Sequence, residues 1–127
     1  MATGYTKTSL PSGGLATTRY KVPALTHTPV NGLTGASKNV VGVRIDARLN
    51  TKEDVFLRMY NNAAPTVGTT AEHACLPCLA GQDITYLSPR GTATFGTDLS
   101  IACTKEKAGD AAGTAPSGTV DVYILVN

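Results

Sequence analysis

From residue 40 onward, apolar and polar positions alternate along the chain with a period of two, which is the period of a half-buried β-strand. In residues 41–49 the odd positions are apolar and the even positions are glycine or charged. No stretch shows helical periodicity with capping residues. Together with the turn-forming Asn, Pro and Gly between these segments, the pattern predicts an all-β fold, an antiparallel sandwich or jelly roll. The expected strands are 40–49, 55–60, 72–79, 82–87, 92–95, 98–103 and 119–126.

The alternation also predicts which side chains form the core. Within each expected strand the aliphatic residues share one face, and this face must be buried against the second sheet. The predicted core residues are Val43, Ile45, Leu57, Met59, Leu99, Ile101, Val122 and Ile124.

Residues 1–39 have a different composition, dominated by Thr, Gly, Ser and Pro with scattered aliphatic residues. Pro11, Pro23 and Pro29 argue against a helix interior and against a central strand. We therefore predict two parts, an extended N-terminal arm at 1–39 and a β-sandwich domain at 40–127. Either the arm is a flexible tail, or it becomes ordered along a partner or a neighbouring subunit.

Charge is divided unevenly between these parts. Residues 1–45 carry five basic residues and no acid, and residues 46–127 carry six basic and nine acidic residues, which together give the net charge of +2. The basic residues are too widely spaced for the basic stripe of a nucleic-acid-binding protein. We expect an acidic neighbour for the arm and no nucleic-acid partner.

The composition narrows the class of protein further. A chain of 127 residues fits one domain. No apolar run approaches the roughly 18 residues of a membrane helix, and residues 1–7 lack the apolar core of a signal peptide. The odd number of cysteines, three, indicates a reducing compartment and argues against a disulfide framework. We expect no membrane association.

Cys75 and Cys78 form a Cys-x-x-Cys motif, which occurs in zinc sites and in redox pairs. Residues three apart on a strand point to opposite faces, so both thiolates reach one metal only if Pro77 lies in a turn. Cys103 is the one further cysteine, and no helix follows the motif as in thioredoxin-like proteins. We predict that the three cysteines are structural and bind no metal.

Catalytic motifs are not recognisable in the sequence. Histidine occurs only at His27 and His73. No nucleophile elbow, phosphate-binding glycine loop or paired-carboxylate motif is present. We predict a protein that is not an enzyme and needs no cofactor.

Two groups of residues are candidate interface positions. One group is basic and aromatic and lies in the arm. The other lies on residues 55–60 opposite the aliphatic face, where an aromatic side chain and an arginine form a common interface anchor or, in a fully buried strand, part of the core. The candidate residues are Arg19, Tyr20, Lys21, Phe56, Arg58 and Tyr60.

Residues 57–70 read Leu-Arg-Met-Tyr-Asn-Asn-Ala-Ala-Pro-Thr-Val-Gly-Thr-Thr. They resemble a group of small tailed-phage proteins in which a strand ending in Lys/Arg-x-Tyr-Asn precedes an Ala-Pro-Thr-x-Gly-Thr loop. The resemblance continues through the Cys-Leu-Ala-Gly of residues 78–81, through residues 95–102 and into the apolar segment 119–126. The chain departs from the group at Cys75, Cys78 and Asp98, and the arm has no counterpart.

The resemblance implies a β-sandwich virion component, most specifically a non-enzymatic capsid decoration or cement protein. The implied partners are the major capsid protein and further copies of the chain, as a homotrimer, with the arm gripping the capsid surface. Assembly would take place in the host cytoplasm. A tail or fibre module that binds a host receptor or glycan is the alternative function, and a small metal or redox protein is a third class.

Overall fold

A computed structural model describes residues 4–11, 13–88, 93–107, 109–110 and 113–127. These residues form strands and loops, with no helix among them, so the predicted all-β class is confirmed. The strands are β1 (Thr6–Ser9), β2 (Thr18–Val22), β3 (Lys38–Leu49), β4 (Val55–Tyr60), β5 (Ala74–Cys78), β6 (Asp83–Leu87), β7 (Ala93–Phe95), β8 (Ser100–Thr104) and β9 (Thr119–Val126).

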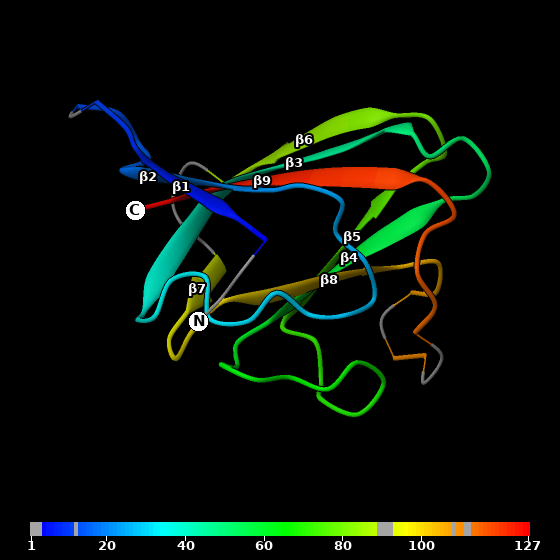
Figure 1. Ribbon diagram of the computed structural model, residues 1–127. Coiled ribbons are helices and arrows are strands. Elements are labelled where there is room, and N and C mark those ends of the chain that lie inside the picture. Colours follow the sequence, from blue (N-terminus) through cyan, green and yellow to red (C-terminus); the bar gives the residue numbers. More distant parts are fainter. Residues whose placement is uncertain (1–3, 12, 89–92, 108, 111–112) are drawn as a thin grey trace.

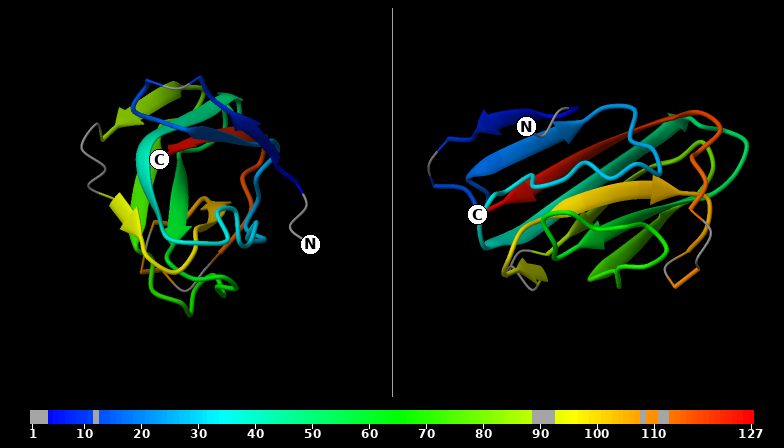
Figure 2. Two further views of the ribbon diagram at one scale, coloured as in Figure 1. Left: turned by 90° about the vertical axis from the view of Figure 1, so that its left-hand side faces the viewer. Right: turned by 60° about the horizontal axis from the view of Figure 1, so that its bottom comes forward.

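The strands form two antiparallel sheets that pack face to face (Figure 1). The larger sheet has the order β1-β2-β9-β3-β6, and β7 pairs with the beginning of β3. The smaller sheet has the order β5-β4-β8. Figure 2 shows both layers from two further sides. This arrangement confirms the β-sandwich, and the jelly-roll path stays a prediction.

The hydrophobic core lies between the two sheets. Each sheet turns one face of alternating aliphatic residues inward, as antiparallel strands with one buried face do. Ile45 and Ile124 reach the core from the larger sheet, and Leu57 and Ile101 reach it from the smaller one, all with no exposed surface. The eight predicted core residues are all buried, so this prediction is confirmed.

Strand β3 departs from strict alternation at two places. Its register with β9 shifts between Val40 and Gly42 and again between Asp46 and Leu49. A bulge adds one residue to a strand and reverses which face the following residues occupy. Val40 therefore joins the core, whereas Val41 lies on the outer face and Leu49 is 76% exposed.

The N-terminal segment does not form an arm outside the sandwich, and this expectation needs correction. β2 pairs with β9 along its whole length, from Thr18 opposite Val126 to Val22 opposite Val122. Tyr20 is 2% exposed and belongs to the core together with Val22. The segment that we expected to be separate therefore supplies part of the larger sheet.

The residues after β2 also belong to the body, because they cover the open edge of β8. Val30 and Ile101 form an antiparallel bridge, and the Leu33 amide donates a hydrogen bond of 2.8 Å to the Leu99 carbonyl. Pro11 and Pro23 fall just after strands instead of within them. The prolines thus limit the lengths of β1 and β2 without preventing their pairing.

Ile45→Ala and Leu49→Ala form a matched pair on β3. We expect Ile45→Ala to lower the free energy of unfolding by about 2–5 kcal/mol, because it leaves a cavity in a fully buried site. Leu49→Ala should change it by less than about 0.5 kcal/mol, because that side chain faces solvent. Urea denaturation measures both values, and equal effects would show that the face of β3 is wrongly assigned.

Deleting residues 1–35 should abolish cooperative unfolding. The deletion removes Tyr20, Val22, Leu25 and Leu33 from the core and exposes one edge of β9. Each large buried apolar side chain contributes about 1.5–3 kcal/mol, and four such losses approach the total stability of a small domain, about 5–15 kcal/mol. Thermal melting followed by circular dichroism tests this, and a sharp transition near that of the intact chain would contradict it.

Candidate interaction surface

The outer face of the larger sheet is the candidate functional surface. Because alternate residues of a strand point to opposite faces, the inward residues of β9 leave Tyr123 and Leu125 on this outer face. Arg19 and Lys21 of β2 lie beside Tyr123 on the same face. One end of this face is apolar and the other is cationic.

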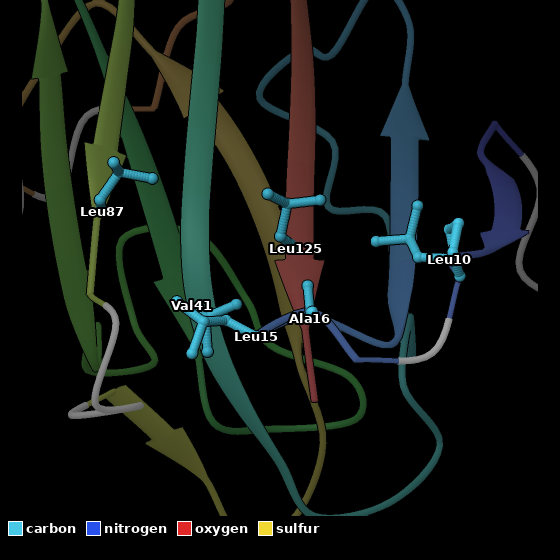
Figure 3. A pocket seen from close by; sticks show the side chains of 8 residues that line it. Leu10, Leu15, Ala16, Val41, Leu87 and Leu125 are labelled. Carbon is cyan, nitrogen blue, oxygen red and sulfur yellow. The ribbon is translucent and has the colours of Figure 1, made fainter.

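The apolar end is a groove with a volume of about 490 Å³. Figure 3 shows side chains of β3, β6 and β9 facing residues of the β1–β2 connection across it. Leu87 and Leu15 are 71% and 63% exposed and line the same groove, so they form an exposed apolar patch. The groove is lined by Leu10, Pro11, Gly14, Leu15, Ala16, Val41, Leu87 and Leu125.

Gly42 allows two of these leucines to approach each other over β3. A Cβ atom at this position would lie 3.2 Å from Leu125 Cδ1 and 3.4 Å from Leu87 Cδ2. The space above Gly42 is therefore already filled by the two side chains. A side chain here would force at least one of them to move and would change the shape of the groove.

The cationic end is organised around the ring of Tyr123. The guanidinium carbon of Arg44 lies 4.9 Å from the ring centroid, Lys21 Nζ lies 5.8 Å from it, and the guanidinium carbon of Arg19 lies 5.9 Å from it. Cations within about 6 Å of an aromatic centroid are attracted by its quadrupole. The tyrosine therefore holds three positive side chains close together.

Two ion pairs lie on β3 and β6 next to this cluster, and one of them includes Arg44. Arg44 donates to both carboxylate oxygens of Asp83 at 3.0 and 2.8 Å, and Arg48 donates to both oxygens of Asp46 at 2.9 and 2.8 Å. The hydrogen bonds from Arg48 hold the pKa of Asp46 at about 2. Those from Arg44 also lower the pKa of Asp83.

Arg19 and Lys21 differ from these arginines. Within the described part of the chain, neither of them lies within ion-pair distance of a carboxylate. Both were predicted as interface residues, and the structure brings them together over Tyr123. The third residue of that predicted group, Tyr20, points the other way into the core.

The candidates on β4 lie on the outer face of the smaller sheet, which the loops after β4 and β8 cover (Figure 1). Arg58 is fully buried and donates hydrogen bonds to the carbonyl oxygens of Glu106 and Lys107, both at 2.9 Å. Tyr60 is also fully buried, and Phe56 is half-buried. These residues were expected to be either an interface anchor or buried. Arg58 and Tyr60 are buried, because the loops pack on that face.

The three cysteines lie in strands and form no disulfide bond with one another. Cys78 points into the core, Cys75 points away from it, and Pro77 lies between them within β5, so the two thiols do face opposite sides. Burial raises the pKa of Cys103 to about 12 and also raises that of Cys78. Protonated thiols are weak nucleophiles and weak metal ligands.

Neither histidine forms part of a recognisable metal site. His27 is exposed, and His73 packs against the ring of Phe95 with centroids 4.7 Å apart. Among the described residues, no three His, Cys, Asp or Glu side chains are grouped closely enough to hold a metal ion. The same residues contain no helix of the length and apolarity that a bilayer span requires.

Sequence reasoning missed Tyr123, Leu87 and Leu125. Alternation in residues 119–126 already places Tyr123 and Leu125 opposite the aliphatic core face. The signal was therefore present in the strand itself, but its neighbours on β2 and β6 could not be recognised without the strand order.

Comparison with known proteins gives little further information. No protein-family model matches the chain, and no curated protein sequence matches it. A chain in the X-ray crystallographic structure of tomato aspermy virus is similar at 17% sequence identity, with a TM-score of 0.37. The alignment covers 98% of this chain and 78% of that one. A likeness at this TM-score carries no argument about function.

Acidification should weaken the fold partly through Asp46. Its folded-state pKa of about 2 lies below the unfolded value of about 3.9. The ionised carboxylate therefore stabilises the fold above about pH 4, and this contribution is lost as the pH falls towards 2. Asp46→Asn should show a smaller drop in melting temperature between about pH 6 and pH 2.5 than the wild type.

Asp54→Asn is the control for this comparison. Asp54 accepts a backbone hydrogen bond from Ala80, and no described cation lies within ion-pair distance of it. An identical acid response in Asp46→Asn and the wild type would show that the Arg48 pair does not stabilise the fold.

Proposed function

We propose that this chain is a non-enzymatic structural protein of a virion, specifically a decoration or cement protein on the outside of a tailed-phage capsid. The proposed binding role rests on one observation, the contrast between the outer faces of the two sheets. Loops cover the outer face of the smaller sheet, whereas the larger sheet leaves Leu87 exposed and Leu125 and Tyr123 half-buried. Arg19 and Lys21 lie beside Tyr123 and have no carboxylate within ion-pair distance among the described residues. The virion context is supported by the sequence resemblance over residues 40–127.

The larger sheet, with the β1–β2 connection, replaces the arm as the proposed capsid-binding element. Exposed apolar area on a rigid sheet can dock without the loss of entropy that ordering a flexible tail requires. Leu10 and Leu15 of the β1–β2 connection line the same groove as Leu87 of β6. The proposed partner is the major capsid protein, and the proposed location is the capsid surface. Assembly would take place in the host cytoplasm.

Self-association as a homotrimer stays part of the proposal by analogy with decoration proteins at capsid three-fold positions. Catalysis is not part of it. The buried thiols of Cys78 and Cys103 have raised pKa values, which disfavours the thiolate form that a nucleophile needs. These two thiols are therefore poorly suited to act as nucleophiles.

Leu87→Asp should weaken binding to capsids that lack the protein by at least about tenfold, because a charge in an apolar contact is costly to desolvate. Leu79→Asp is the matched control, since Leu79 is 61% exposed and lies outside the groove. Co-sedimentation with capsids measures both variants. Equal binding by the two variants would contradict docking through this face, and recovery of the protein only with tails or fibres would contradict the capsid location.

A further inference from the structure

The apolar groove and the cationic cluster form one continuous surface. Leu10 and Leu125 line the groove and also line the neighbouring hollow that contains Arg19, Arg44 and Tyr123. A ligand that occupies the groove therefore extends directly into the cationic end. A single ligand that spans both ends needs an apolar group for the first and a negative charge for the second.

The spacing of the two ends is set by strand β9. Leu125 and Tyr123 are two residues apart on the same face, which corresponds to about 7 Å along a strand. An extended peptide has the same repeat, so its side chains at positions i and i+2 point to the same side about 7 Å apart. A peptide along β9 would thus place one side chain in the groove and the second beside Arg19 and Lys21, which lie against the Tyr123 ring.

The charge of the second side chain follows from the ion pairs. Asp83 already neutralises Arg44, whereas Arg19 and Lys21 have no carboxylate partner among the described residues. A carboxylate that reaches these two cations gains charge-assisted hydrogen bonds to both of them. This favours Asp or Glu at the second position.

We propose that the outer face of the larger sheet binds an extended peptide segment that carries an aliphatic side chain and a carboxylate two residues apart. The aliphatic side chain occupies the groove between Leu87 and Leu125, and the carboxylate binds Arg19 and Lys21. Assigning this segment to a capsid subunit rests on the function proposed above. The peptide chemistry itself rests only on the geometry of this face.

A second copy of the chain is not the proposed partner, because its described surface lacks such a segment. Among the described residues, no exposed Leu, Ile, Val or Met lies two positions from an Asp or Glu. A single-stranded nucleic acid fits less well, because base stacking needs exposed aromatic faces. The groove is lined by aliphatic residues, and three cations already surround the ring of Tyr123.

Nuclear magnetic resonance titration of the full chain with short peptides tests the proposal. The probe is acetyl-Gly-Leu-Thr-Asp-Gly-amide, and its isomer acetyl-Gly-Thr-Leu-Asp-Gly-amide has the same composition with Leu and Asp adjacent. We expect the probe to shift the resonances of Leu87, Leu125 and Tyr123 saturably, with a Kd of roughly 1 mM, as a short flexible peptide allows. The isomer, and a probe with Lys in place of Asp, should bind about tenfold more weakly or worse.

Charge-matched variants test the carboxylate site. The double variant Arg19→Ala, Lys21→Ala should weaken binding of the Asp probe about tenfold, while a probe with Asn in place of Asp should be little affected. The control Lys52→Ala, Lys105→Ala removes the same charge from exposed positions outside the face and should retain wild-type affinity. Melting curves of both double variants establish that they are folded.

Several results would overturn the proposal. They are equal affinity for the probe and its isomer, no shift of groove resonances up to about 10 mM probe, or displacement of these resonances by a DNA or RNA oligonucleotide instead. Concentration-dependent shifts without peptide would show that a second copy covers the face. Peptide binding without capsid binding would support this inference and contradict the virion role, whereas capsid binding without peptide binding would do the reverse.

Discussion

The structure depends on the position of β9 between β2 and β3. β9 pairs with β3 through the middle of the larger sheet and with all five residues of β2 on its other edge. One face of β9 buries four aliphatic side chains, and the opposite face presents Tyr123 and Leu125. The core and the binding surface are therefore two faces of one strand, and a change in its register would alter both.

The two sheets use their outer faces differently, and this difference has a physical origin. The outer face of the smaller sheet carries Arg58, a charge that is buried only because hydroxyl and carbonyl oxygens and Glu72 surround its guanidinium. Those partners come with the loops that cover the sheet. On the outer face of the larger sheet, the described β1–β2 connection lines the groove without filling it, so Leu87 stays exposed and Arg19 stays exposed near Tyr123.

The sequence was most informative where strands alternate without interruption. The expected bounds of β9 agree with the structure, because all of its inward positions are aliphatic. The bulges of β3 were not predictable, since a bulge depends on the partner strand, and the alternation alone assigns Val41 and Leu49 to the core face. β2 was missed because its pairing partner lies about 100 residues away in the sequence, so local composition suggested an arm.

The central position of β9 has a consequence for the order of folding. β2 and β3 are made early, yet neither can acquire its shared neighbour until synthesis has passed residue 126. Until then both strands present unpaired edges, which are prone to pair with other chains. Sheets that depend on such distant pairings fold slowly. The larger sheet is therefore complete only after β9 has been translated, and the incomplete sheet is prone to aggregate until then.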